Sequence, residues 1–256
     1  VEAAAEAAEE APRVLTVCLN PTLQRTVLLK SRLRPGDVNR ADLGCVNASG
    51  KGVNVTRVLV QLGVPALHLC QAHPESPNAA RFLSLAAADG VRVCVVDSGP
   101  LTDVRCCTTL LDEAGATEVT ESGSRVPAGA DERVLSTYTH VLETHSASLK
   151  AVVISGSKAP GFSDRLFAEM TKLAKARGLF VLLDVRGADL KECLPCRPDV
   201  VKPNKAELCE TFFAGRDATT SDVADCMKQL WAEYGTRAVV TRGAEDTLYV
   251  GSDGMV

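Results

Sequence analysis

The segment with the clearest chemical potential is residues 47–54, which read NASGKGVN and run directly into an amphipathic stretch, VTRVLVQLG. Gly50 and Gly52 flank Lys51, and glycine lets a backbone turn tightly and approach a ligand closely because it has no Cβ. A lysine at the start of a helix adds its charge to free N–H groups and a helix dipole that already favour an anion. Asn54 adds an amide that can bind hydroxyls. The pattern predicts a cradle for a small phosphorylated molecule, or equally a strand-to-helix turn with a solvated lysine.

A second candidate site is the pair Asn204 and Glu207, which lie three residues apart in the sequence VKPNKAE and so share one helix face. An amide and a carboxylate on one face can organise Mg²⁺, which prefers oxygen ligands and keeps several waters. The same pair can instead be a capping asparagine followed by a stabilising first-turn glutamate. Asp184 ends one apolar run, and Thr241 to Gly243 ends another. Both positions are therefore candidates to line a ligand site at strand ends.

The elements that must position these residues follow from the hydrophobic pattern. Continuous apolar runs predict buried strands at 14–19, 66–71, 91–97, 151–155, 179–184, 200–202 and 237–241. Helical spacing predicts helices within 134–142, 163–178 and 223–235, with Ser163 as an N-cap and Gly178 and Gly235 as stops. This alternation predicts an α/β domain with a mostly parallel sheet covered on both faces by helices.

Two stretches do not follow this alternation of strands and helices. Residues 25–45 alternate in character around a Pro35-Gly36 turn, and residues 104–119 predict two strands around Glu113 to Gly115. We expect them to form a small antiparallel layer, within about 22–48 and 104–120, set apart from the main sheet. Ligands of open α/β sheets bind outside the carboxyl ends of the strands, so such a layer would act as a lid that excludes water.

Composition excludes some classes of function. The 256 residues are 46% hydrophobic and 23% charged, which is enough for one sizeable core. A net charge of −4 gives no basic field for nucleic acid or a membrane surface, and no apolar run is long enough to span a bilayer. The ten cysteines lack zinc-ligand spacing and indicate buried thiols in a reducing compartment, such as the cytoplasm. The four histidines form no ligand pattern, so none is predicted to be catalytic.

The two ends of the sequence are unusual. Residues 1–12 are acidic and of low complexity, without an initiator methionine. We expect a disordered leader or the edge of a fragment there, with one domain over residues 13–256. Such a start leaves import into an organelle open. Residues 251–256 interrupt what the pattern predicts to be a hairpin, as a chain with its C-terminal part missing would.

Five motifs occur in the order and spacing of the ribokinase-like sugar kinases, over nearly all of residues 13–250. They are NPTLQ at 20–24, SGKGVNV at 49–55, ISGS at 154–157 with Pro160-Gly161, LD at 183–184 and VKPNKAE at 201–207. The chain resembles the phosphofructokinase B branch, especially 1-phosphofructokinases and tagatose-6-phosphate kinases. The resemblance implies a three-layer α/β fold and transfer of a phosphoryl group from ATP, with Mg²⁺, to a ketohexose phosphate. Fructose 1-phosphate, fructose 6-phosphate and tagatose 6-phosphate stay open as acceptors.

The resemblance also implies roles for individual residues. The acceptor sugar phosphate would be held by Asn20, Gln24, Gly50, Lys51, Gly52, Asn54 and Arg105. Arg105 corresponds to an arginine that clamps the substrate phosphate, a task that suits a planar group able to grip two phosphate oxygens. The nucleotide side would comprise Asp184, Lys202, Asn204, Glu207, Thr241 and Gly243, with Glu207 near Mg²⁺, partly through water. Lid strands of this family often pair between subunits, which implies a homodimer.

The chain departs from the family pattern at several positions. Gln24 stands where an aspartate usually fixes sugar hydroxyls, Ser49 replaces a glycine and Arg186 replaces a serine. The glycine-rich segment expected after the second strand of the main sheet reads AHPESP, at 72–77. A Gly-Ala-Gly-Asp motif, which in the family forms an anion hole and supplies the general base, does not occur before the last residue, Val256. Loss of a general base alone costs about 10²–10⁴-fold in rate. No catalytic residue is therefore assigned, and this polypeptide is expected to be inactive.

Three hypotheses follow from the sequence. The first is an incomplete chain of a sugar-phosphate kinase of the 1-phosphofructokinase type. The second is a catalytically silent homologue that binds or senses a sugar phosphate, which the departures at Gln24, Ser49 and Arg186 motivate. The third, a nucleoside kinase of the same fold, is disfavoured because Lys51 and Arg105 suit an acceptor that bears a phosphate.

Overall fold

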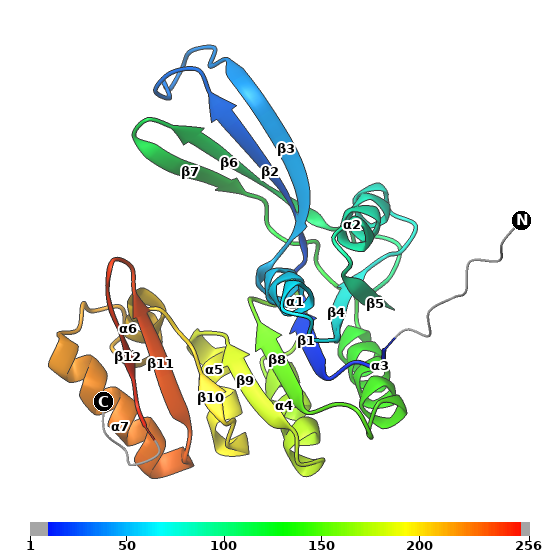
Figure 1. The fold of residues 1–256 in the computed structure, drawn as a ribbon, viewed down its shortest axis with the longest axis vertical. Coiled ribbons are helices and arrows are strands. Elements are labelled where there is room, and N and C mark those ends of the chain that lie inside the picture. Colours follow the sequence, from blue (N-terminus) through cyan, green and yellow to red (C-terminus); the bar gives the residue numbers. More distant parts are fainter. Residues whose placement is uncertain (1–9, 252–256) are drawn as a thin grey trace, which may run out of the picture.

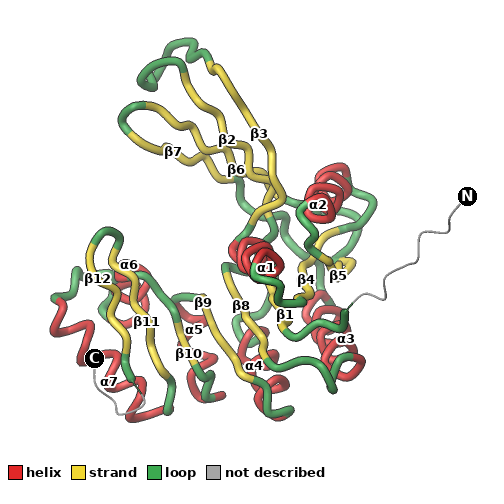
Figure 2. Tube along the Cα trace, in the orientation of Figure 1, coloured by secondary structure: helices red, strands yellow, loops and turns green. Residues whose placement is uncertain are grey.

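The computed structural model describes residues 10–251, and it shows a large sheet with helices on it and a smaller sheet that projects away (Figures 1 and 2). Most of the expected leader lies outside the described residues, but Pro12 is buried, so the folded part includes it. No helix among the described residues is long and apolar enough to cross a membrane.

The large sheet has eight strands in the order β12-β11-β10-β9-β8-β1-β4-β5. All neighbours are parallel except the β11–β12 hairpin. Seven of these strands are the predicted apolar runs, which confirms the expected sheet. The strands are β1 (Val14–Cys18), β4 (Ala66–Ala72), β5 (Arg92–Asp97), β8 (Ala151–Ser155), β9 (Phe180–Asp184), β10 (Val200–Val201), β11 (Arg237–Arg242) and β12 (Glu245–Tyr249).

Helices cover this sheet unequally on its two faces. One face is packed by α3 to α7 in a single core, in which Leu15 and Val17 of β1 face Tyr138 of α3 and Phe167 of α4. On the other face, α1 and α2 are the only helices within residues 10–251 that pack, over β1, β4 and β5. The helices are α1 (Lys51–Gln61), α2 (Pro77–Ala88), α3 (Ala130–Thr144), α4 (Leu166–Ala176), α5 (Gly187–Cys193), α6 (Lys205–Phe212) and α7 (Thr220–Tyr234), with a 3₁₀ turn, η1 (Leu194–Cys196).

The second face is open over the other half of the sheet. Among the described residues no helix lies on it over β9, β10 and β11 (Figure 1). Leu182, Val200 and Val239 point to this face, since their neighbours in each strand are in the main core, and they are only partly buried. In the part of the chain that the structure describes, the three-layer arrangement is therefore complete around β1 and β4 and lacks one layer around β10.

The predicted helices within 134–142 and 223–235 are present, and Gly235 ends α7 in the left-handed conformation, as expected. The N-cap predicted at Ser163 is wrong. The Ser163 Oγ instead accepts a hydrogen bond from the Arg165 N–H, which closes a short turn. The helix α4 begins only after that turn, at Leu166.

The projecting sheet has four strands in the order β3-β2-β6-β7. They are β2 (Thr22–Leu29), β3 (Ala41–Ser49), β6 (Arg105–Asp112) and β7 (Gly115–Thr120), so β3 runs one residue past the range expected for the lid. The expectation of a purely antiparallel layer is wrong, because β2 and β6 pair in parallel from Thr22–Arg105 to Leu28–Leu111. Each antiparallel hairpin forms locally, but the two hairpins meet side by side with their inner strands in the same direction. The lid is therefore a mixed sheet.

Candidate functional site

A polar cavity of about 650 Å³ lies where β8 and β9 end, beside the start of α1. Ligands of open α/β sheets bind at this edge. A second cavity of about 640 Å³ lies between η1, α6 and α7, but it contains neither the glycine turn nor a strand end. We therefore place the candidate site in the first cavity. Its lining is Lys51, Arg105, Glu118, Gly156, Ser157, Asp164, Asp184, Val185, Arg186, Gly187, Ala188, Asp189, Glu207 and Glu210.

The glycine turn before α1 needs both of its glycines. Gly50 is the N-cap with φ 116°, a conformation that side chains rarely adopt, and it has no side-chain cap. Gly52 is required for space: a Cβ there would lie 2.8 Å from the Cys18 Cβ and 2.9 Å from the His68 Cε1. The start of α1 is thus pressed directly onto β1 and β4, and Lys51 projects from it at a fixed place.

A buried hydrogen-bond chain supports this turn from below. The His68 Nδ1 lies 2.7 Å from the Thr16 Oγ1, which lies 2.6 Å from the Thr56 Oγ1. The Thr56 hydroxyl donates to the Gly52 carbonyl at 2.8 Å. His68 is fully buried, and burial lowers its pKa to about 3. The histidine is therefore neutral and structural, and its role was not apparent from the sequence.

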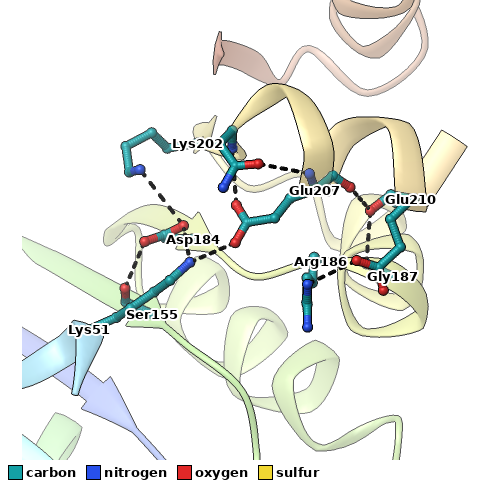
Figure 3. A network of polar contacts seen from close by, with 10 residues as sticks. Lys51, Ser155, Asp184, Arg186, Gly187, Lys202, Glu207 and Glu210 are labelled. Atoms are coloured by element: carbon teal, nitrogen blue, oxygen red, sulfur yellow. Dashed lines mark hydrogen bonds and ion pairs between the residues drawn. The ribbon is translucent and has the colours of Figure 1, made fainter. Parts of the chain in front are cut away.

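Lys51 is already paired with two carboxylates from the other side of the cavity (Figure 3). Its Nζ lies 2.9 Å from Glu207 Oε1 and 3.2 Å from Asp184 Oδ1. Partial burial by itself lowers the pKa of the Lys51 ammonium, but the hydrogen bond to Glu207 and the charge of Asp184 outweigh it and raise the pKa above its ordinary value. Lys51 is a permanent cation that links the glycine turn to β9 and α6.

Asp184 is the most enclosed charge of this group, with a side chain only 10% exposed. Its Oδ2 accepts a hydrogen bond from the Ser155 hydroxyl at the end of β8. The ammonium of Lys202 lies 3.8 Å from its Oδ1 (Figure 3). Asp184 and Lys202, both predicted for the nucleotide side, are therefore neighbours in the structure.

Asn204 and Glu207 form a complete capping box at the start of α6. The Asn204 Oδ1 accepts from the Glu207 N–H at 2.8 Å, and Glu207 Oε2 accepts from the Asn204 N–H at 3.0 Å. Burial by itself raises the pKa of Glu207, but the hydrogen bonds from Asn204 and Lys51 outweigh it and lower the pKa below its usual range. The capping alternative is thus present in the structure, and Glu207 keeps its other oxygen, Oε1, for the cavity.

The structure brings Arg105 and Lys51 to one cavity, although they come from the lid and from α1. The guanidinium of Arg105 donates to the Thr22 hydroxyl and to the Glu121 carbonyl, which hold it at the base of the lid. Asn20 reaches the same cavity indirectly, since its amide donates to the Ser157 hydroxyl at 3.1 Å. Lys51 and Arg105 therefore line one cavity, and Asn20 lies beside it.

Gln24 and Asn54 lie elsewhere. They line a separate cavity of about 400 Å³ together with Arg57 and Asp89. The Gln24 amide donates to the Thr109 hydroxyl of β6, and the Asn54 Oδ1 accepts from the Arg57 guanidinium. In this arrangement of the lid, neither side chain lines the cavity that contains Lys51.

Thr241 and Gly243 also lie outside the lining of the main cavity. Thr241 forms an isolated parallel bridge with Asn204, and its N–H donates to the Pro203 carbonyl. Gly243 occupies the turn of the β11–β12 hairpin with φ 65°. Thr241 therefore adjoins the start of α6, and neither residue lines the cavity.

Several lining residues were not assigned from the sequence. Ser157 ends the ISGS motif, and its position just after an apolar run is the signal that could have placed it at the sheet edge. Asp189 of α5 forms an ion pair with Lys158, whose side chain is nearly buried against the Phe167 ring. Arg186 pairs with Glu210 at 2.9 Å, with both side chains more than half exposed. Each of these contacts joins a loop residue to a helix that is distant in sequence, so no local pattern reveals them.

The carboxylate oxygens near Lys51 provide part of the ligand set that Mg²⁺ needs. Over residues 10–251 no group of three or more histidine, cysteine or acidic side chains converges on one point. Asp184 and Glu207, however, direct one oxygen each toward the same place, which the Lys51 ammonium occupies. Mg²⁺ in phosphoryl-transfer sites commonly binds one or two carboxylates plus water and phosphate oxygens. These two residues therefore suit such an ion, with the remaining ligands from solvent or nucleotide.

The chain is similar to known proteins over most of its length. The profile described as "pfkB family carbohydrate kinase" matches residues 17–256. Among solved structures, a possible 1-phosphofructokinase from Thermotoga maritima is 23% identical, with TM-score 0.81 over 94% of this chain and 75% of that one. Phosphofructokinase-2 from Escherichia coli in complex with fructose-6-phosphate is 21% identical, with TM-score 0.80 over 96% and 78%. Ribokinase from Arabidopsis thaliana with ribose and ATP is 18% identical, with TM-score 0.66 over 94% and 75%. These structural likenesses concern the fold.

Proposed function

This chain belongs to the pfkB family of carbohydrate kinases, and we propose that it serves ATP-dependent phosphorylation of a ketohexose phosphate, as a 1-phosphofructokinase does. One observation carries the proposal: Lys51 and Arg105, two cations from separate elements, line one cavity at the carboxyl ends of β8 and β9. An acceptor that already bears a phosphate gains from such a pair, whereas a neutral sugar or nucleoside does not. The same reasoning disfavours a nucleoside kinase.

In this proposal the residues divide into two sides of the cavity. Lys51, Arg105 and Asn20, with the backbone of Gly50 and Gly52, hold the acceptor. Asp184, Lys202, Asn204 and Glu207 face the nucleotide, with Thr241 and Gly243 behind them. A Mg²⁺ ion held by Glu207 or Asp184, partly through water, would neutralise charge on the transferring phosphoryl group.

Gln24, on lid strand β2, enters the acceptor site only if the lid moves, whereas Asn54 lies on the fixed helix α1 beside the lid. Both side chains lie at the base of the lid, and Gln24 is bound to β6 of the same sheet. Lid closure over bound substrate is a common way to complete a site and exclude water. We propose that they contact the sugar hydroxyls in the closed form. Pairing of subunits through the exposed lid strand β7 and a cytoplasmic location remain parts of the same proposal.

Catalysis of phosphoryl transfer also needs a general base and an anion hole. The family resemblance assigns the general base and the anion hole to a glycine-rich motif that residues 10–251 do not contain. We propose that the complete enzyme carries an additional layer that supplies both. The open apolar face over β9 to β11 supports this, because the partly buried Leu182, Val200 and Val239 would be covered by it. The 256-residue chain would then bind the acceptor but transfer phosphate very slowly.

A catalytically silent sugar-phosphate-binding protein is the second candidate. The observation that favours it is Gln24, which replaces a charged acceptor and is bound to Thr109 in the lid. Titration calorimetry with fructose 1-phosphate, fructose 6-phosphate and tagatose 6-phosphate, paired with a coupled kinase assay, separates the two. Binding together with ATP turnover by the full-length protein supports a kinase. Binding without turnover in that protein supports the silent alternative.

The acceptor site itself is tested by Lys51→Met, with Lys205→Met as the matched control. Both lysines occupy the first position of a helix, but Lys205 pairs with Asp217 away from the cavity. A hydrogen bond to a charged group contributes about 1.5–3 kcal/mol, so Lys51→Met should weaken sugar-phosphate binding, measured in the presence of Mg²⁺, about 10–100-fold. Lys205→Met should leave it unchanged. Equal affinities of the two variants would remove Lys51 from the acceptor site.

A further inference from the structure

The position of Lys51 conflicts with its proposed task. A phosphate-binding lysine should present its ammonium to the cavity, yet this one is held by Asp184 and Glu207 at 3.2 and 2.9 Å. An ammonium has three donors, so two of them are used. A phosphate that approached the third would also approach two carboxylates, and like charges repel. Lys51 cannot bind a phosphate well while both carboxylates hold it.

Those two carboxylates have little else to neutralise them. Asp184 and Glu207 have side chains only 10% and 14% exposed, so they retain little water. Lys202 contacts the same Asp184 oxygen as Lys51, but at a longer 3.8 Å. If Lys51 left without replacement, two enclosed negative charges would face each other, which is unfavourable. Release of Lys51 therefore requires a different cation between the carboxylates.

We propose that Lys51 occupies a divalent-cation position in the free protein, and that a divalent cation bound by Asp184 and Glu207 releases Lys51 to the sugar phosphate. The proposal rests on the acceptor role given to Lys51 above. The exchange needs no backbone movement, because the flexible four-carbon stem of Lys51 lets its ammonium move. Gly50 and Gly52 keep the start of α1 in place meanwhile. Divalent-cation binding and sugar-phosphate binding are then positively coupled, and by linkage each tightens the other.

Glu207→Gln is the informative variant. Glutamine in this position keeps the capping box, since its amide oxygen still accepts from the Asn204 N–H, so α6 should still begin correctly. It removes the charge that holds Lys51 and that would bind the cation. Coupling free energies are commonly equivalent to a five-fold or larger change in affinity, so we expect about that effect.

The first measurement is calorimetric titration of fructose 1-phosphate without nucleotide, in Mg²⁺ and in NaCl of equal ionic strength. In the wild type, Mg²⁺ should tighten binding about five-fold. In Glu207→Gln, binding without Mg²⁺ should already be about five-fold tighter than in the wild type, and Mg²⁺ should add nothing. Unaltered wild-type affinity in Mg²⁺, or weaker binding by Glu207→Gln, would overturn the exchange.

The second measurement observes Lys51 directly and needs no sugar. In protein that carries ¹³C at the lysine Cε, which leaves the ammonium unmodified, the Lys51 signal is assigned by its loss in Lys51→Met and followed during Mg²⁺ titration. The signal should shift in the wild type and stay fixed in Glu207→Gln. A fixed signal in the wild type overturns the exchange even if sugar phosphate binds. A shifting signal with no sugar-phosphate binding in any condition leaves the exchange standing and rejects the acceptor role of Lys51.

Discussion

The two helices that meet at the cavity begin with similar residues but are held in opposite ways. α1 begins with Lys51-Gly52, and α6 begins with Lys205-Ala206. Gly52 is buried against β1 and β4, and the cap before it makes no side-chain hydrogen bond. Ala206 is exposed, and its helix begins in a capping box of Asn204. One start is therefore fixed by the core beneath it, and the other by its own four residues.

The two helix starts should therefore respond differently to substitutions. The start of α1 should tolerate no added volume, because it touches buried atoms on one side and the cavity on the other. The start of α6 should tolerate changes of volume but not loss of its polar cap. Lys51 joins the two starts through Glu207, so a change at either can be read in the affinity for sugar phosphate.

The largest effect is expected for Gly52→Ala. The new Cβ would lie 2.8 Å from the Cys18 Cβ and 3.1 Å from the Val17 carbonyl, so the start of α1 must shift. Overpacking of this kind costs about 1–3 kcal/mol, and the shift should also weaken sugar-phosphate binding. Chemical denaturation and calorimetry measure the two effects. The reciprocal change in α6, Ala206→Gly, should cost at most about 1 kcal/mol and leave affinity unchanged. Similar losses in the two variants would contradict the comparison.

The second effect depends on pH. Burial lowers the pKa of His68 to about 3, below its ordinary 6.5, so the folded protein keeps this histidine neutral. Its contribution to stability is fully present above pH 6.5 and is lost as the pH falls from 6.5 toward 3, because only the unfolded chain takes up the proton. At pH 5 the loss is about 2 kcal/mol relative to pH 7.

His68→Gln should flatten this part of the pH profile, measured as the free energy of unfolding in urea between pH 7 and 5. The matched control is His140→Gln on the exposed face of α3, which should keep the wild-type slope. A wild-type slope in His68→Gln would mean that the buried chain below the glycine turn does not depend on a neutral histidine.

The starts of α1 and α6 also differ in how far the sequence predicts them. Asn204 and Glu207 are three residues apart, so both their shared face and the capping alternative follow from local spacing. The strands likewise follow from continuous apolar runs such as residues 151–155. The crowding of Gly52 depends on Cys18 and His68, which only the parallel pairing of β1 and β4 brings beneath it.

Contacts between residues distant in sequence could not be predicted from the spacing of residues within a motif. The parallel contact of β2 with β6 joins two hairpins whose sequences each predict only antiparallel neighbours. The ion pair between Lys51 and Glu207 joins residues 156 positions apart, which the resemblance assigned to different substrates. Alternation along β2 indicates that Gln24 belongs to the lid, but it cannot tell which cavity the side chain faces. These features depend on how the elements pack together, not on any one of them.

A smaller effect is expected for Asn204→Ala, which tests whether this residue does more than cap α6. Loss of an N-cap costs about 1 kcal/mol. Thr219→Ala removes the equivalent capping box of α7, away from the cavity, and should cost about the same. If Asn204 also organises the nucleotide side, only Asn204→Ala will weaken binding of Mg²⁺-ATP, measured by calorimetry. Equal ATP affinities would restrict Asn204 to its capping role.

The smallest effect on stability is expected for Arg186→Ser, which restores the family residue at this position. The Arg186–Glu210 pair is more than half exposed on both sides, and such pairs contribute about 0–1 kcal/mol. Arg186 is nevertheless one of only three cations among the described residues that line the cavity, against six carboxylates. Removing it makes the cavity more negative, so we expect ATP affinity to fall several-fold at low salt and less at high salt.

Glu210→Gln separates the two roles of this arginine. It breaks the same ion pair but leaves Arg186 charged and free, so stability should again change little while ATP affinity rises at low salt. Opposite changes in ATP affinity in Arg186→Ser and Glu210→Gln would show that Arg186, an exposed side chain between β9 and α5, contributes through its charge alone. Lys51, by contrast, acts from a position that Gly52 and the core fix. Equal ATP affinities in both variants would instead place Arg186 outside the range of the bound phosphates, and leave Lys202 as the cation on the α6 side.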